Sequence, residues 1–147
     1  MSPEAQKSEE AQNVAILKEA YRRWSDSRGG SADHWVSICD ENLKFGSIAE
    51  PLAGVDYMTS YRRREDIGQY FAGLARDWEM IEYRVDHFVA QGDRVVMLGH
   101  CSWRAKESGK VVSTPKCDSW RFADGKAVEF YEYFDTAQVM QAMAATG

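Results

Sequence analysis

The period of the hydrophobic pattern changes near Ile81, and this change limits the possible folds more than any other feature of the chain. Before Ile81, apolar residues recur every three or four positions, which is the pattern of an amphipathic helix. After Ile81, apolar and polar residues alternate, which is the pattern of a strand with one buried face. The order of these segments predicts an α+β domain in which helices precede a sheet and enclose an apolar pocket with it.

Three helices are expected before the sheet. The first begins near Ser8, a good N-cap residue, and residues 1–7 are expected to form a flexible tail. The second is short and follows Ser31 or Asp33, and the third covers about 64–78. Their apolar stripes consist of Val14, Leu17, Tyr21 and Trp24, then Trp35, Ile38 and Cys39, then Ile67, Tyr70, Phe71, Leu74 and Trp78.

Four long strands, separated by turns that contain glycine, are expected after Ile81: 81–90, 94–106, 111–123 and 126–134. Strands of this length predict a strongly curved antiparallel sheet. A short strand at 43–48 is expected to precede them, and a last helix to follow Asp135 or Thr136.

The segment 49–62 is long and irregular, and loops of this kind often cover a site. We expect it to form a lid whose Tyr57, Met58 and Tyr61 help to set the size of the substrate.

The composition suits one domain, expected at 8–145, and excludes several classes of function. The 18 basic and 23 acidic residues give a net charge of −5, which argues against nucleic acid as a partner because phosphate binding needs a concentrated basic surface. No apolar stretch reaches the ~18 residues of a membrane span. The three cysteines lack zinc or redox spacing, and phosphate-binding loops are absent. We therefore expect a reduced, cytoplasmic protein without metal or cofactor.

Two acidic residues interrupt apolar faces of the predicted sheet. Glu132 breaks the series Val128, Phe130 and Phe134, and Asp118 lies in the series that contains Trp120. A buried carboxylate costs several kcal/mol unless it is hydrogen-bonded or neutral, so these positions are candidates for a functional site.

The turn at Asp124-Gly125 decides whether the two carboxylates share a face. A two-residue turn places them on opposite faces, and a three-residue turn places them on the same face. The second turn also aligns the apolar residues of both strands, so we expect it here and, by similarity, at 107–110. The expected register puts His100, Lys116 and Glu132 in one row, with Asp118 one pair further along, opposite Leu98 and Phe130. A simple Lys116–Glu132 ion pair, with His100 satisfied nearby, explains that row equally well.

The helices, the long loop and the meander that ends in residues 125–136 (GKAVEFYEYFDT) resemble the SnoaL-like, ketosteroid-isomerase-like branch of the nuclear-transport-factor-two-like superfamily. The resemblance covers about 8–145 and implies a cone-shaped, curved antiparallel sheet wrapped by three N-terminal helices, an α+β barrel. This fold carries isomerases, cyclases, epoxide hydrolases, dehydratases and non-catalytic domains, so it specifies an activity poorly.

In ketosteroid isomerases, a tyrosine on the first helix and a protonated aspartate donate hydrogen bonds to the substrate oxyanion. Tyr21 and Asp118 fall at matching places, whereas Gly46 or Ser47 occupies the position of the isomerase base. Glu132 falls at the place of one acid of limonene-epoxide-type hydrolases, and the other members of that set fall near His100 and Ser102.

The leading hypothesis is a cofactor-independent acid/base enzyme of the isomerase, cyclase or dehydratase type, acting on a small, mostly apolar carbonyl or enol compound. Asp118 and Tyr21 would stabilise an oxyanion, and Glu132, assisted by His100, would move the proton. The substrate-binding residues expected beside them are Trp120, Phe130, Phe45, Tyr57, Met58, Tyr61, Ser102 and Lys116.

Two alternatives to this enzyme are a non-catalytic binding or dimerisation domain and an epoxide-hydrolase-like enzyme. A homodimer is also expected, because the second face of the sheet is expected to carry a set of apolar residues too large to stay wet: Val95, Met97, Cys101, Trp103 and Tyr131.

Overall fold

The computed structural model describes residues 2–49 and 63–144. Its helices are α1 (Pro3–Asp26), α2 (Ala32–Ile38), the short 3-10 helix η2 (Arg64–Asp66), α3 (Ile67–Asp77) and α4 (Thr136–Met143). Its strands are β1 (Cys39–Ser47), β2 (Trp78–Gln91), β3 (Arg94–Ala105), β4 (Val111–Ala123) and β5 (Lys126–Phe134). Among the described residues, no helix is both long and apolar enough to cross a membrane.

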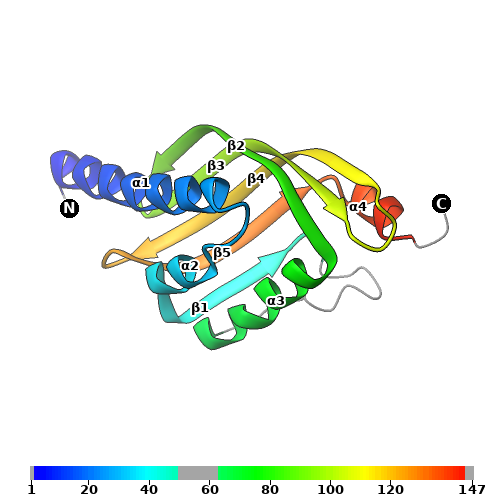
Figure 1. The fold of residues 1–147 in the computed structure, drawn as a ribbon. Helices are drawn as coiled ribbons and strands as arrows, with labels where there is room; N and C mark the ends of the chain where they lie inside the picture. The colour runs from blue at the N-terminus through cyan, green and yellow to red at the C-terminus, as the bar shows by residue number, and fades with distance from the viewer. Residues whose placement is uncertain (1, 50–62, 145–147) are drawn as a thin grey trace.

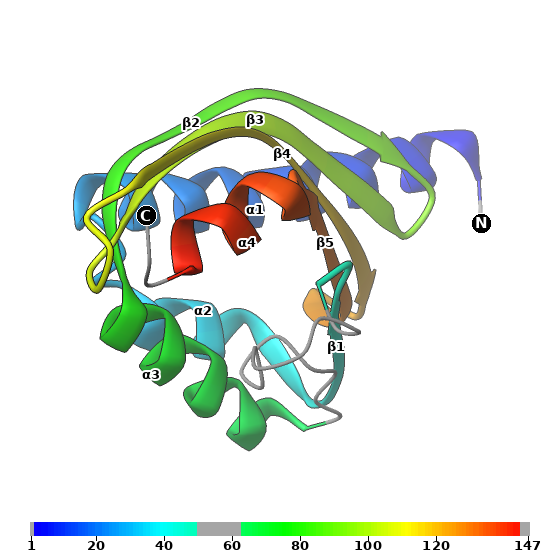
Figure 2. The same ribbon diagram turned by 90° about the vertical axis from the view of Figure 1, so that its right-hand side faces the viewer.

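The five strands form one curved sheet in the order β1-β5-β4-β3-β2 (Figure 1). Strands β2 to β5 pair antiparallel, as predicted, whereas β1 adds to β5 in the parallel direction. The sheet arches over the helices, and α2 and α3 face the arch across the interior (Figure 2). The α+β prediction is therefore confirmed, with two refinements: the sheet is mixed, and it is not closed into a barrel.

Helix α1 begins earlier than the sequence predicts. The Ser2 hydroxyl accepts a hydrogen bond from the Ala5 amide at 3.1 Å, and Pro3 occupies the first turn, where its missing N–H costs nothing. Residues 3–7, expected as a flexible tail, are therefore helical. This first part of α1 extends beyond the sheet and is exposed to solvent (Figure 1).

Strand β2 contains two irregular pairings with β3, one between Met80 and Glu82 and one between Val85 and His87. Such bulges bend a strand and increase its twist. Next to the second bulge, a side chain at Gly99 would collide with the Arg84 carbonyl oxygen, so only glycine allows the strands to approach so closely here. These features help the long strands to curve around the interior.

The turn between β4 and β5 differs from the predicted three-residue turn. Asp124 and Gly125 form a two-residue turn with φ values of 50° and 77°, and Ala123 pairs with Lys126. A bulge after Arg121 leaves Val128 without a partner on β4. With the two-residue turn alone, Asp118 and Glu132 would point to opposite faces of the sheet. The extra residue in the bulge shifts the pairing by one position and brings both side chains to the same face. Asp118 and Glu132 consequently share the inner face, as predicted.

The register between these strands nevertheless differs from the prediction. Asp118 pairs directly with Glu132, not with Phe130, and the bulge is the reason. Between β3 and β4, a four-residue loop at 106–109 replaces the predicted three-residue turn, since the Ala105 amide bonds to the Lys110 carbonyl at 2.8 Å. Asp118 therefore pairs with Met97, not with Leu98, and every side chain of β3 points to the face opposite to the predicted one.

This one-residue shift corrects the predicted dimer surface. Val95, Met97 and Cys101 are buried on the inner face with the core, and Trp103 packs against them. Of the five residues proposed for the outer face, only Tyr131 lies there, opposite Ser119.

Candidate functional site

A cavity of about 100 Å³ lies between the inner face of the sheet and the helices. Its walls are mostly aromatic and aliphatic, and only three of the described residues that line it are charged: Lys116, Asp118 and Glu132. All three project from the inner faces of β4 and β5, because residues 116 and 118 are two apart on one strand and Asp118 pairs across to Glu132. The lining therefore resembles an apolar pocket with a few convergent polar groups.

Asp118 is fully engaged by hydrogen-bond donors. Its Oδ2 accepts from the Tyr21 hydroxyl at 2.6 Å and from the Tyr83 hydroxyl at 3.3 Å, and its Oδ1 contacts the Lys116 ammonium. The side chain of Asp118 is 3% exposed, so these donors replace nearly all of its water. Three neighbours thus hold the Asp118 carboxylate as a hydrogen-bond acceptor. This geometry does not favour the expected role of Asp118 as a hydrogen-bond donor to a substrate oxyanion.

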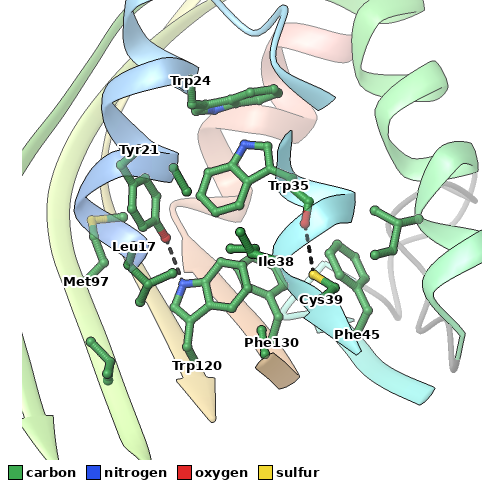
Figure 3. Packing of buried hydrophobic residues seen from close by; sticks show 14 of the residues in the cluster. Leu17, Tyr21, Trp24, Trp35, Ile38, Cys39, Phe45, Met97, Trp120 and Phe130 are labelled. Carbon is green, nitrogen blue, oxygen red and sulfur yellow. Dashed lines mark hydrogen bonds between the residues drawn. The ribbon is translucent and has the colours of Figure 1, made fainter. Parts of the chain in front are cut away.

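Tyr21 connects Asp118 to the aromatic core. Its hydroxyl accepts a hydrogen bond from Trp120 Nε1 at 2.9 Å (Figure 3). The same hydroxyl donates to Asp118. Burial raises the pKa of Tyr21 well above its usual value, and the charge of Asp118 raises it further. The same two causes raise the pKa of Tyr83. Both tyrosines therefore keep their protons, and the Tyr21 proton is directed at Asp118 and not at the cavity.

Lys116 lies between the two carboxylates. Its Nζ contacts Asp118 Oδ1 and is 3.0 Å from Glu132 Oε2, and its side chain is 10% exposed. Burial lowers the pKa of Lys116, but the charges of Asp118 and Glu132 outweigh burial and leave this pKa raised. The raised pKa keeps this group in its ammonium form, and an ammonium carries three N–H donors.

Glu132 is bonded on one oxygen only. Its Oε2 accepts a hydrogen bond from the Tyr70 hydroxyl at 3.1 Å and forms an ion pair with Lys116 Nζ at 3.0 Å. Its Oε1 is buried and has no hydrogen-bond partner among residues 2–49 and 63–144. Leaving a buried carboxylate oxygen unpaired is energetically expensive, so a proton or a ligand donor that reaches Oε1 would be favourable there.

The aromatic walls are packed against this polar cluster. Trp35 stacks on Trp120 with ring centres 5.4 Å apart and an angle of 8° between the planes. Phe45 stacks on Phe130 at 4.8 Å, and Phe130 contacts Trp120 at 4.5 Å (Figure 3). Phe45, Trp120, Phe130 and Lys116, the residues predicted to bind substrate, all line the cavity, and their role in binding stays a prediction.

Two predicted site residues lie elsewhere. His100 and Ser102 are on the outer face of β3, where both contact Ser113: its hydroxyl is 3.5 Å from His100 Nε2 and 2.9 Å from Ser102 Oγ. The four-residue loop at 106–109 is the physical reason, because it moves β3 by one residue. The proposed assistance of His100 to Glu132 is therefore wrong. Tyr57, Met58 and Tyr61 lie outside the described residues.

Tyr70 and Tyr83 are the partners of the carboxylates that the sequence analysis does not identify. Tyr70 lies in α3 and Tyr83 in β2, and both occupy positions expected to be apolar. A buried tyrosine hydroxyl usually finds a hydrogen-bond partner, so two tyrosines on buried faces were a usable signal for nearby acceptors. Ser47, one of the two residues that could stand at the place of the isomerase base, is buried and accepts a hydrogen bond from the Ala49 amide at 3.1 Å.

No group of three or more histidine, cysteine, aspartate or glutamate side chains in the described part of the chain is arranged to hold a metal ion. Cys39, Cys101 and Cys117 are all free thiols. Burial raises the pKa of Cys39 to about 12 and that of Cys101 to about 11, so neither is an activated nucleophile.

Comparisons with known proteins agree with this architecture. An NTF2-like protein of unknown function from Burkholderia pseudomallei K96243 has 20% identity and a TM-score of 0.81, over 91% of this chain and 98% of the other. A putative SnoaL-like polyketide cyclase from Jannaschia sp. CCS1 has 20% identity and a TM-score of 0.76, over 100% and 98%.

A hypothetical protein with a ketosteroid isomerase-like fold from Catenulispora acidiphila DSM 44928, solved in complex with trimethylamine, has 12% identity and a TM-score of 0.69, over 86% and 90%. At these identities, the structures show the fold alone. No curated protein matches the sequence. The SnoaL-like domain family matches residues 17–130, most of the chain, and the protein therefore belongs to the SnoaL-like family.

Proposed function

We propose that the protein is a cofactor-independent acid/base enzyme of the isomerase or cyclase type, acting on a small, mostly apolar carbonyl or enol compound. The observation that carries this proposal is Glu132 Oε1, a buried oxygen without a partner among the described residues, in a cavity with apolar walls. A carboxylate held by two donors on one oxygen presents the other to a ligand in a fixed direction. General acid/base catalysis needs a proton acceptor placed in this way.

In the proposed reaction, Glu132 Oε1 accepts a proton from the carbon next to the substrate carbonyl. The electron pair of that C–H bond moves into the new C=C bond, and the carbonyl oxygen becomes an enolate oxygen. Glu132 then returns the proton to a different carbon or to the oxygen, so the enzyme is regenerated without an oxidant or a reductant. This cycle matches a 1,3-proton shift or the enolisation step of a ring closure.

Lys116 is the group proposed to stabilise the enolate oxygen. Its Nζ is 3.0 Å from Oε2 of the carboxylate that is proposed to move the proton. An ammonium in a site with little water stabilises a developing negative charge far more than it would in solvent. Asp118 and Tyr21 then act as positioning residues that fix Lys116, which revises the oxyanion role expected for them from the sequence.

The proposal is tested by exchange of the α-protons of a neutral cyclic ketone, cyclohexanone, in D₂O followed by NMR. We expect the wild-type protein to accelerate exchange over buffer. Glu132→Gln should reduce the enzyme-dependent rate by about 10²–10⁴-fold, the usual contribution of a general base. Glu129→Gln is the matched control, because Glu129 lies on the same strand but on the outer face, paired with Arg121. Exchange no faster than in buffer would contradict the proposal.

A second candidate is a binding protein without catalysis. The Lys116–Glu132 contact at 3.0 Å favours it, because an ion pair of this kind can close the polar end of a cavity. Tight ligand binding without proton exchange would support this candidate. The epoxide-hydrolase alternative loses its support, since His100 and Ser102 lie on the outer face.

A homodimer through the outer face is also proposed, now on different residues. Leu98, Cys117 and Tyr133 form one row across β3, β4 and β5. Leu98 is 39% and Tyr133 43% exposed, which leaves apolar surface for a partner copy. Light scattering should give twice the chain mass of 16.7 kDa, and Leu98→Lys should shift the population towards single chains. A mass near 16.7 kDa for the wild type at micromolar concentration would exclude the dimer.

A further inference from the structure

We infer that the pocket selects neutral ring compounds that donate a hydrogen bond, such as a cyclic enol or a phenol, and rejects carboxylates. The inference rests on the proposed function, because it names the substrate class of that same site. Three independent features of the cavity carry it: the charge of its polar cluster, the one acceptor without a partner, and the shape of its walls.

The charge of the polar cluster excludes anions. Two carboxylates and one ammonium leave the cluster with one negative charge, and none of the other described residues that line the cavity is charged. The side chains of Lys116, Asp118 and Glu132 are at most 10% exposed, so water screens their charges poorly. A carboxylate guest would place a second negative charge beside them, where like charges repel more strongly than in water.

The unpaired acceptor requires a donor from the guest. Glu132 Oε1 is the only atom of the three charged side chains that is buried without a hydrogen-bond partner in the described part of the chain. A hydroxyl or N–H that reaches it removes the cost of leaving it unpaired, whereas an ether or a hydrocarbon does not. Among neutral guests of the same shape, those with a donor should therefore bind more tightly.

A cationic guest is less favourable than a neutral one, although the cluster is negative overall. Lys116 already occupies the position between the two carboxylates. Its ammonium also lies near two aromatic rings, with Nζ 5.9 Å from the ring centre of Phe130 and 6.0 Å from that of Phe134. A second ammonium at Glu132 would therefore meet the first within the same cluster. A hydroxyl satisfies the same oxygen without this repulsion.

The walls favour a flat guest. The aromatic rings of the walls pack against one another with ring centres 4.5–5.4 Å apart, in the pairs Trp35–Trp120, Phe45–Phe130 and Trp120–Phe130. A planar guest ring could pack against these rings in the same way. A cavity of about 100 Å³ suits a single small ring. A neutral cyclic enol or a phenol meets all three requirements together.

The test is a binding series of four probes with similar rings, measured by isothermal titration calorimetry at neutral pH. Phenol is the neutral donor, anisole has its hydroxyl hydrogen replaced by a methyl group, benzoate is the anion, and benzylammonium is the cation. We expect phenol to bind most tightly, about ten- to hundredfold more tightly than anisole, the range of a hydrogen bond to a charged acceptor. Benzoate should show no measurable binding, and benzylammonium should bind more weakly than phenol.

Two variants locate the effect. Glu132→Gln should abolish the preference of phenol over anisole, and it should allow benzoate to bind because the cluster becomes neutral. Glu129→Gln removes the same charge from the outer face of β5 and should change neither result. Circular dichroism of each variant establishes that the fold is intact, and the wild-type series alone still decides the question if a variant does not fold.

Each outcome bears on the inference. Equal affinities for phenol and anisole, benzoate binding as tightly as phenol, tighter binding of benzylammonium than of phenol, or no binding of phenol would overturn it. Failure of the proposed catalysis can be distinguished from failure of this inference. Selective phenol binding without exchange of cyclohexanone protons would support the ligand class and contradict the proposed enzyme activity. Proton exchange without any preference for phenol would support the enzyme activity and contradict the ligand class.

Discussion

The inner and outer faces of the sheet treat charged residues in opposite ways, although the same strands build both. On the outer face, Arg121 bonds to Glu129 at 2.9 Å, with 40% and 32% of these side chains exposed. On the inner face, the side chains of Lys116, Asp118 and Glu132 are at most 10% exposed.

Exposed ion pairs contribute about 0–1 kcal/mol, whereas burying charges costs several kcal/mol per ion before their attraction offsets it. The Arg121–Glu129 pair is thus an ordinary exposed ion pair with little effect on stability. The inner cluster of Lys116, Asp118 and Glu132 costs free energy of folding, so its presence is better explained by a function than by a gain in stability.

The largest expected difference between the faces concerns the loss of one charged partner. Asp118→Leu leaves Lys116 buried with only Glu132 as counter-ion and leaves two tyrosine hydroxyls without their acceptor. We expect the free energy of unfolding to fall by about 3–5 kcal/mol, the usual cost of breaking a buried pair from one side.

Arg121→Leu is the matched change on the outer face and should cost no more than about 1 kcal/mol. Urea denaturation of both variants measures the difference. Equal losses would show that the two faces do not differ energetically in the way proposed.

A smaller effect is expected from Tyr21→Phe. The change removes the shortest tyrosine bond to Asp118 and leaves Trp120 Nε1 as a buried donor without its acceptor. A loss of about 1–3 kcal/mol follows, the cost of an unsatisfied buried polar group.

Tyr83→Phe is the control, because the bond of Tyr83 to the same oxygen is longer, at 3.3 Å, and no donor in the described part of the chain is bonded to its hydroxyl. Thermal denaturation should therefore rank Tyr83→Phe as the milder change. A Tyr21→Phe variant of wild-type stability that lost proton exchange would instead restore the catalytic role expected for Tyr21 from the sequence.

The smallest expected contrast is in thiol reactivity. Cys101 lies on the inner face with a pKa of about 11, because burial disfavours its thiolate. Cys117 lies on the outer face of β4 and is half-buried, and burial raises its pKa as well. A raised pKa lowers the fraction of reactive thiolate, so access decides the order. Iodoacetamide followed by mass spectrometry, applied to the Leu98→Lys variant so that no partner copy covers Cys117, should label Cys117 before Cys101 and Cys39. The opposite order would contradict the assignment of faces.

The alternation of polar and apolar residues was enough to find Asp118, Glu132 and Lys116 and to place them on one face. It was not enough to fix the register, because two local features of the chain decide it. The bulge at Val128 and the four-residue loop at 106–109 each shift the pairing of a strand by one residue. The bulge compensated for the wrong prediction of a three-residue turn at Asp124-Gly125, so Asp118 and Glu132 still share a face. The loop had no such compensation, and it moved His100 to the outer face.

The partners of the carboxylates lay beyond what a single strand pattern can show. Tyr70 reaches Glu132 from α3 and Tyr83 reaches Asp118 from β2, and these contacts depend on how far the sheet curves. The parallel addition of β1 to β5 is also a long-range feature. Periodicity predicts elements and faces, but it carries no information on which distant element closes over a given residue.

The division of roles between the two buried carboxylates is tested most directly by carboxyl-carbon NMR during a titration with phenol. Glu132, with one unpaired oxygen, should show a large chemical-shift change as the ligand donates to Oε1. Asp118, held by Tyr21, Tyr83 and Lys116, should show almost none. A shift at Asp118 with Glu132 unchanged would contradict the account, because it would make Asp118 the carboxylate that meets the ligand.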